Sequence, residues 1–390
     1  MKAPTPITAP ITSVFVTANQ SKHREVARLL SGLDVRWERL DLARPISDDL
    51  AAIARARAEE AHERLGGQPC FVENTGLYLH DREGQPGPGF KRLWRELGEA
   101  GFAARFGGAK GIARVAVALA RSDTDVRVFE GSISGTLLSA PRGEGGYGYD
   151  RLWVPDGYDR TLGEMAESTY VVNMRAAPYL ELGACLRGEP SPGVFEAHVT
   201  VSSAAEDGAF RRACGEIGVK CISIDLPAGE TRRQPMTGSF HRGSLLDAQR
   251  EAIAIGQELV RRGFDVVRTK IEQHGRLENA PATDEEARRA GPNSYFEYHA
   301  KLLIAPGSDE PAIRRALAKA GGHLSSNAAN PSSNERFVTL RAFGLGRENA
   351  ERRFRDLLSA IAEQGLPIRN RVREYTVFDS NPHTDHGWID

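Results

Sequence analysis

Residues 145–155 read Gly-Gly-Tyr-Gly-Tyr-Asp-Arg-Leu-Trp-Val-Pro, and this stretch is the most informative about the fold. Its three glycines permit tight turns and let the backbone approach a ligand closely. Tyr147 and Tyr149 can stack on a flat ring, and Asp150 can accept hydrogen bonds from a base or a sugar. The alternative is a glycine-rich hairpin loop whose tyrosines belong to the core.

Two earlier segments follow predicted strands and carry residues suited to phosphate and metal. Thr17-Ala-Asn-Gln-Ser-Lys22 leads from a strand into a helix, where free backbone N–H groups and the helix dipole favour an anion. Glu73-Asn-Thr-Gly-Leu77 ends another strand, where a carboxylate can hold Mg²⁺. Taken singly, these segments are equally typical of a capped surface helix and of a strand that enters a turn.

In this order, the three segments resemble the inosine triphosphate pyrophosphatase family, which removes pyrophosphate from non-canonical purine nucleoside triphosphates. The resemblance extends over roughly residues 14–182. It implies a mixed, strongly curved sheet with flanking helices, a homodimer, a nucleoside triphosphate substrate and Mg²⁺ as cofactor.

The resemblance also implies individual site residues. It implies Glu73 as the magnesium ligand and as a catalytic residue, together with position 74, which is Asn74 here. The implied substrate-binding residues are Thr17, Asn19, Lys22, Arg57, Lys91, Tyr147, Gly148, Tyr149, Asp150 and Arg175.

The chain departs from the family pattern at positions that carry chemistry. The family usually has a second acid at position 74, and the amide of Asn74 cannot serve as a base. The Asp-Leu-x-Glu element reads Asp41-Leu-Ala-Arg44, so a cation replaces an acid associated with magnesium. The Ser-His-Arg motif that reads the purine is here Asn173-Met-Arg175. A catalytically impaired module that binds nucleotide and regulates is therefore an alternative to an active enzyme.

Length and composition indicate a soluble protein with two domains. The chain has 390 residues, of which 40% are hydrophobic and 26% charged, with a net charge of -1. These values predict no general attraction to nucleic acid or membrane. Four cysteines without paired spacing favour a reducing compartment, and we expect a cytoplasmic protein. We expect an α/β domain over residues 12–186, a linker over 187–194 and a second domain over 195–390.

The second half of the chain contains an internal repeat. Residues 195–201, Phe-Glu-Ala-His-Val-Thr-Val, reappear as Phe-Glu-Tyr-His-Ala-Lys-Leu at 296–302. The pattern around each copy predicts the order β-α-β-β-α-β over residues 195–272 and 295–380. We therefore expect an α+β domain made of two ferredoxin-like repeats.

The two copies place a histidine at matching positions, which raises the possibility of a second site. His198 and Thr200 resemble half of a two-histidine phosphoesterase signature, and His299 and Lys301 form an altered second half. In that family one histidine acts as a base and the other as an acid. The alternative is a pair of inward-facing histidines kept for packing after a duplication. Phosphodiesterase chemistry in the repeat domain is thus a further hypothesis.

Overall fold

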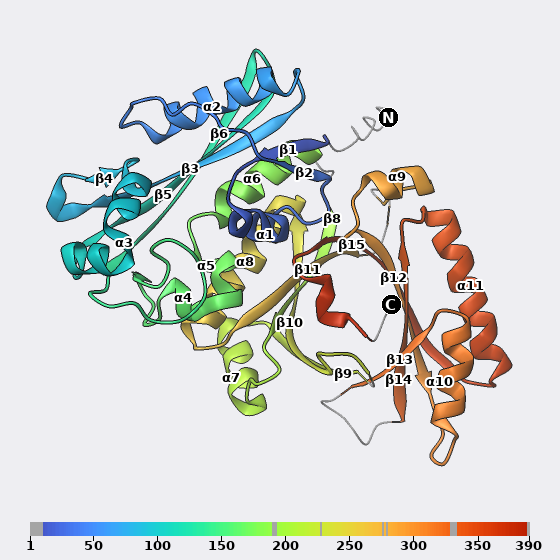
Figure 1. The fold of residues 1–390 in the computed structure, drawn as a ribbon. Coiled ribbons are helices and arrows are strands. Elements are labelled where there is room, and N and C mark those ends of the chain that lie inside the picture. Colours follow the sequence, from blue (N-terminus) through green and yellow to red (C-terminus); the bar gives the residue numbers. More distant parts are fainter. Residues whose placement is uncertain are drawn as a thin grey trace.

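The computed structural model describes residues 11–188, 193–226, 228–274, 277, 280–327 and 334–387. The first half contains a mixed seven-stranded sheet, and the second half contains a closed eight-stranded barrel (Figure 1). Residues 189–192 of the expected linker lie outside the described residues. Within the described part of the chain, no helix has the length and apolar character needed to cross a membrane.

The sheet has the strand order β2-β1-β3-β5-β6-β7, with β4 paired to β3. Strand β1 runs parallel to β2 and β3, whereas the pairs β3–β4, β3–β5, β5–β6 and β6–β7 are antiparallel. The strands are β1 (Ser13–Val16), β2 (Val35–Glu38), β3 (Cys70–Leu79), β4 (Pro86–Gly87), β5 (Lys110–Ser122), β6 (Asp125–Leu137) and β7 (Trp153–Pro155). The prediction of a mixed sheet with flanking helices is confirmed.

Helices cover both faces of this sheet. They are α1 (Gln20–Leu29), α2 (Leu50–Arg64), α3 (Phe90–Phe106), α4 (Leu162–Met165), α5 (Thr169–Val172) and α6 (Ala176–Arg187). On one face, α2 buries Ala54, Ala58 and Ala61 in one cluster with three alanines of β5. Alanine on both surfaces lets the helix lie close to the sheet. The opposite face packs aromatic and aliphatic side chains against α1, α3 and α6.

The second half repeats the predicted order twice. The first repeat consists of β8 (Gly193–Val201), α7 (Asp207–Ile217), β9 (Lys220–Asp225), β10 (Arg233–Gly243), α8 (Leu245–Arg261) and β11 (Val266–His274). After α9 (Asp284–Arg289), the second repeat consists of β12 (Tyr295–Leu303), α10 (Glu310–Lys319), β13 (His323–Asn327), β14 (Glu335–Phe343), α11 (Arg347–Glu363) and β15 (Ile368–Asp379). A short 3-10 helix, η3 (Pro382–Asp385), follows.

The two repeats close into one barrel, which the sequence did not predict. Strand β11 pairs with β15 and strand β9 pairs with β13, so both edge strands of each repeat are paired with the other repeat. Phe195, Ala197 and Val199 of β8 pack in the core under the helices. Because side chains alternate along a strand, Glu196 and His198 face the barrel interior.

The sheet and the first repeat share one hydrophobic core. The cluster that contains Phe15 and Phe71 of the sheet also contains Phe210 and Leu259 of the first repeat. Helix α8 packs against α6 and α5, and Figure 1 shows α8 between the sheet and the barrel. The Tyr170 hydroxyl lies 2.7 Å from Oγ1 of Thr269 across this boundary. The two halves are therefore joined by packed side chains and not only by a linker.

A glycine on α8 tests this shared core. A Cβ atom added at Gly256 would lie 3.3 Å from Cγ1 of Val171 on α5. We expect Gly256→Leu to lower the free energy of unfolding by about 1–3 kcal/mol through overpacking. Gly215 on α7 is the control because no atom lies within 4 Å of its added Cβ. Urea unfolding of both variants checks this; equal effects would show that α8 does not pack tightly on the first half.

Candidate functional site

A cavity of about 210 Å³ opens between the sheet, α3 and the loop before β7. Among its lining residues are the predicted Asn19, Lys22, Lys91, Tyr147, Gly148, Tyr149, Asp150 and Arg175. The lining also includes Thr75, Phe90, Trp94 and Arg95, which sequence reasoning did not name. The three segments singled out in the sequence thus meet at one cleft.

The segment after β1 organises the start of α1. Oδ1 of Asn19 accepts hydrogen bonds from the backbone N–H groups of Ser21 at 2.9 Å and Lys22 at 3.2 Å. Asn19 is therefore the N-cap of the helix, and its side-chain NH₂ group can still donate. Thr17 is not among the residues that line the cavity; its hydroxyl oxygen accepts from the backbone N–H of Asn19 at 3.2 Å. Thr17 shapes the loop that carries the cleft residues.

Glu73 forms the centre of a buried ion cluster. Its side chain is 1% exposed and lies 2.5 Å from Nζ of Lys22. Arg175 donates to both carboxylate oxygens at 3.0 Å, and the Tyr179 hydroxyl donates at 2.9 Å. Burial raises the pKa of Glu73, but Arg175 and Lys22 outweigh burial and hold that pKa well below its usual range. Glu73 therefore stays ionised.

This arrangement does not fit a magnesium ion held by the protein. Both oxygens of Glu73 already bind cations, and Oδ1 of Asn74 accepts a hydrogen bond from Arg57. Magnesium prefers carboxylate oxygens that remain free to coordinate it. Within the described residues, no group of three or more Asp, Glu, His or Cys side chains has the geometry of a metal site. The contacts of Glu73 therefore do not support the expectation, drawn from the sequence, that Glu73 is a metal ligand.

The loop at residues 146–150 is folded around Asp150. The carboxylate of Asp150 accepts from the backbone N–H of Tyr147 at 2.8 Å. Gly146 has φ +79°, and a Cβ there would lie 2.5 Å from Cβ of Asp150, so glycine is required. Burial raises the pKa of Asp150 to about 7. The loop therefore presents a carboxyl group that titrates near neutral pH.

The two tyrosines of the loop have different surroundings. The Tyr149 ring packs against Phe90 and Trp153, with centroids 4.9 Å and 5.9 Å away. Its buried hydroxyl has no hydrogen-bond partner among the described residues, although buried hydroxyls are normally paired. The Tyr147 ring lies 5.3 Å from the guanidinium carbon of Arg175. Tyr149 is thus mainly a core residue that offers a polar tip to the cavity.

Glu25 and Tyr179 are cluster members that the sequence analysis missed. Glu25 accepts from the Tyr147 hydroxyl at 3.2 Å and from Asn173, and lies 3.5 Å from Arg175. Their spacing in the sequence could have indicated that they lie beside the predicted site residues. Glu25 lies three residues after Lys22 on α1, and Tyr179 on α6 lies four residues after Arg175, the N-cap of that helix. Such spacings place side chains on one helix face.

Lys91 contributes an amine that has no carboxylate partner among the described residues and that becomes a cation when an anion binds beside it. No hydrogen bond or ion pair of its ammonium group is found among the described residues, and it lines the cavity. Lys22 lowers the pKa of Lys91 most, followed by burial and Arg44, to about 6. A bound anion would relieve this repulsion and favour the charged ammonium.

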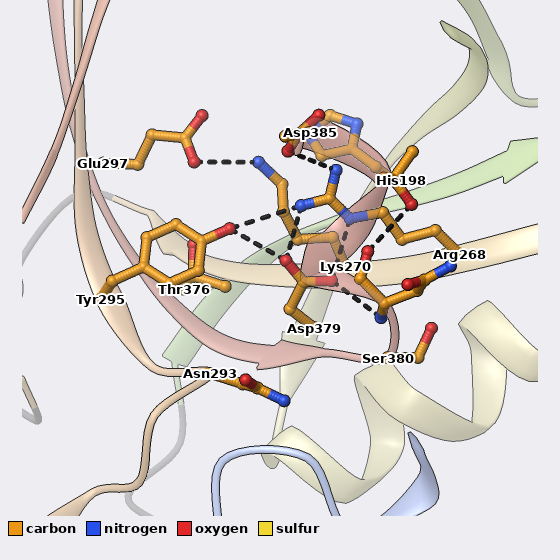
Figure 2. A network of polar contacts seen from close by, with 12 residues as sticks. His198, Arg268, Lys270, Asn293, Tyr295, Glu297, Thr376, Asp379, Ser380 and Asp385 are labelled. Carbon is orange, nitrogen blue, oxygen red and sulfur yellow. Dashed lines mark hydrogen bonds and ion pairs between the residues drawn. The ribbon is translucent and has the colours of Figure 1, made fainter. Parts of the chain in front are cut away.

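The barrel interior holds a second, fully paired ion network, which Figure 2 shows. Arg268 of β11 lies 2.5 Å from Asp379 and 2.8 Å from Asp385 of η3. Arg341 of β14 lies 2.7 Å from Asp385 and 2.8 Å from Glu297. The C-terminal Asp385 therefore bridges an arginine from each repeat.

The two repeat histidines lie in equivalent carboxylate pairs. Nε2 of His198 lies 3.3 Å from Glu272 and 3.8 Å from Glu196. Nε2 of His299 lies 3.3 Å from Glu297 and 3.5 Å from Glu374.

These carboxylates keep His299 positively charged. Burial lowers the pKa of His299, but hydrogen bonds to Glu297 and Glu374 outweigh burial and raise it to about 10. Burial lowers the pKa of His198 as well, but Glu272 and Glu196 outweigh burial and raise it, so both histidines favour the charged form and neither is held ready as the base. Lys301, two residues after His299, pairs with Glu335 at 2.7 Å, and Thr200, two residues after His198, is buried. The observed partners favour the packing interpretation over a two-histidine active site.

Comparison with known proteins bears on the half that contains the cleft. Residues 13–176 match the model of the Ham1 family. Over 184 residues the chain is 31% identical to the dITP/XTP pyrophosphatase of Ignicoccus hospitalis, an overlap that covers 96% of that protein and 45% of this chain. This chain belongs to the Ham1 family. The resemblance stated from the three cleft segments is confirmed.

A further curated relative and a solved structure are also similar to this chain. The chain is 34% identical over 158 residues to inosine triphosphate pyrophosphatase 1 of Trypanosoma cruzi, covering 80% of that protein and 39% of this chain. It is also similar to a solved HAM1 protein from Coxiella burnetii, with 21% identity, a TM-score of 0.39, and coverage of 98% of that chain and 45% of this one. These matches give no support to the phosphoesterase resemblance of the second half.

The raised pKa of Asp150 predicts a pH-dependent cost of folding. An unfolded Asp ionises near pH 3.9, whereas buried Asp150 keeps its proton to about pH 7, so the wild type loses stability as pH rises between these values. Asp150→Asn keeps an oxygen for the Tyr147 N–H and removes the titration. We expect the Asn variant to gain stability relative to wild type as the pH rises from about 4 to about 7, by roughly 1.4 kcal/mol per pH unit. Thermal unfolding across this range measures the difference, and a constant difference contradicts the prediction.

The barrel network predicts a large effect of one carboxylate. Asp385→Ala leaves Arg268 and Arg341 buried without this partner, and we expect a loss of about 3–5 kcal/mol of unfolding free energy. The control is Glu181→Ala, which removes a half-exposed ion pair with Arg250 and costs about 1 kcal/mol or less. Chemical unfolding compares the two variants. Similar costs would show that η3 does not hold the repeats together.

Proposed function

We propose that the first half of the chain is a nucleoside triphosphate pyrophosphatase that acts on non-canonical purine nucleotides and releases the monophosphate and pyrophosphate. One observation carries this proposal: in a Ham1-family chain, Lys22, Lys91 and Arg175 line the same cleft as the loop at residues 147–150. The curated relatives named dITP/XTP and inosine triphosphate pyrophosphatases support the choice of substrate.

The cleft suggests how a nucleotide would lie. The base would lie against the 147–150 loop, where the free Tyr149 hydroxyl and the Asp150 carboxyl can hydrogen-bond to its polar edge. The phosphates would extend towards Lys22 in the first turn of α1 and Lys91 in the first turn of α3. A cavity of about 210 Å³ is smaller than the roughly 300–1,000 Å³ of typical ligand sites, so the phosphates would occupy the more open side.

The reaction would depend on positioning and charge. Water attacks the α-phosphorus, the bond to the bridging oxygen breaks, and pyrophosphate leaves with that oxygen. Neither neighbouring residue of β3 is a good base, because Glu73 is held ionised by two cations and Asn74 is an amide. Cations that face the phosphates would stabilise charge in the transition state.

Three further expectations stay predictions. Magnesium as cofactor, a homodimer and a cytoplasmic location follow from the resemblance and the composition. Magnesium binding concerns the cleft directly, and the side chains around Glu73 do not fit a magnesium ion because Arg175 and Lys22 occupy its carboxylate oxygens.

A nucleotide-binding module without turnover is the second candidate. The hydrogen bond from Arg57 to Asn74 favours it, because the residue at the expected water-activating position is neutral and already engaged. Binding without pyrophosphate release would identify this function.

Replacing Lys91 tests the proposed activity without breaking an observed ion pair. We expect Lys91→Ala to lower kcat/KM for inosine triphosphate by about 10- to 100-fold, which corresponds to losing about 1.4–3 kcal/mol of transition-state stabilisation. Arg92→Ala is the control because Arg92 is the next residue of α3 and is exposed. Pyrophosphate release is measured with inosine, xanthosine, adenosine and guanosine triphosphates. No release from any of them by the wild type would overturn the enzyme proposal.

A further inference from the structure

Two cations lie near the cleft, at or beside positions where the family pattern has metal-associated acids: Arg44 and Arg57 do not line the cavity, but both repel Lys91, which does. Arg44 stands in place of the acid of the Asp-Leu-x-Glu element, and Asn74 replaces the second acid of β3. Arg57 of α2 donates to Oδ1 of Asn74, so a guanidinium group lies beside the substituted position. These changes turn a place for a divalent cation into a place that already carries positive charge.

The positive charge is not balanced inside the protein. Among the charged groups that act most strongly on Lys91, Lys22, Arg44 and Arg57 lower its pKa, and the carboxylate of Glu73, which acts less strongly than Arg44 and more strongly than Arg57, raises it. On Arg57, repulsion from Arg44 is a stronger effect than attraction by Glu60. Like charges held together at partly buried positions are unfavourable unless an anion joins them.

Unused hydrogen-bond donors lie beside these charges. Nε of Arg57 is buried and has no partner among the described residues. Buried donors are normally satisfied, so this N–H group is available to a partner from outside the chain. Guanidinium groups present a planar fork that matches phosphate oxygens, and Arg44 and Arg57 can therefore bind a phosphate chain in a directed manner.

We propose that this cleft binds a triphosphate chain without a divalent cation, with Arg44, Arg57 and Lys91 supplying the positive charge that a metal ion would otherwise bring. The inference rests on the proposed function for the location of the phosphates. Lys22 and Arg175 are partly neutralised by Glu73, whereas the three named cations have no carboxylate partner in the described structure. The Glu73 cluster thus fixes Lys22 and Arg175 in the wall of the cleft, and the three cations without a carboxylate partner supply the further charge for the phosphates.

The test is titration calorimetry of the full chain with inorganic tripolyphosphate, in EDTA and in excess Mg²⁺. We expect binding in EDTA to be no weaker than in Mg²⁺. Arg44→Ala and Arg57→Ala should each weaken binding in EDTA by about tenfold, equivalent to about 1.4 kcal/mol. Arg55→Ala is the matched control, because Arg55 lies on α2, is exposed and donates only to the Val126 carbonyl among the described residues.

A second variant reverses the proposed change. Asn74→Asp combined with Arg44→Glu restores two acids, and we expect weaker binding in EDTA that Mg²⁺ rescues. Binding by the wild type only in Mg²⁺, or equal effects of the Arg44, Arg57 and Arg55 variants, would overturn the inference.

The result separates this inference from the proposed function. Binding of tripolyphosphate in EDTA without pyrophosphate release from any nucleotide would support the metal-free site and contradict the enzyme. Pyrophosphate release that needs Mg²⁺, with no binding in EDTA, would support the enzyme and contradict the metal-free site.

Discussion

The buried carboxylate of Glu73 is the interaction on which the cleft depends. It lies on β3 in the middle of the sheet and binds Lys22 of α1, Arg175 at the start of α6 and Tyr179 of α6. Removing one partner from such a buried cluster costs several kcal/mol because an uncompensated charge remains. Glu73 thereby fixes how two helices and the central strand meet, and the cavity forms where they converge.

A comparison of the two ion networks shows what distinguishes a structural cluster from a binding site. In the barrel, Arg268 and Arg341 each contact two carboxylates, and Lys270 lies between Glu272 and Glu297. In the cleft, Lys91 has no carboxylate partner in the described structure and Arg57 has an unpaired donor. A balanced network needs no ligand, whereas excess positive charge with unpaired donors favours an anion.

Several residues of the cleft lie in short motifs, so the segments and the family resemblance could name them. The structure places Lys22, Asp150 and Arg175 around one cavity, and their role as substrate-binding residues stays a prediction. The repeat pattern likewise predicted the order of strands and helices in the second half. Closure of the barrel was not predictable. Sequence periodicity predicts where strands lie, but it does not show which edge strands pair with each other, as β11 and β15 do.

The sequence also could not show which polar groups are already paired with other side chains. Glu73 reads as a metal ligand in its motif, and only the arrangement of α1 and α6 shows that cations occupy its oxygens. The sequence also did not predict that α8 shares a hydrophobic core with the sheet, because this core forms from segments that are far apart in the chain.

The most direct test of a metal-free phosphate site is a crystal structure with a non-hydrolysable inosine triphosphate analogue, grown without divalent metal. We expect the base against the 147–150 loop and the phosphates in contact with Lys91 and Arg57, with the Glu73 cluster unchanged. Phosphates coordinated through a metal ion to Glu73, or an analogue bound in the barrel, would contradict it.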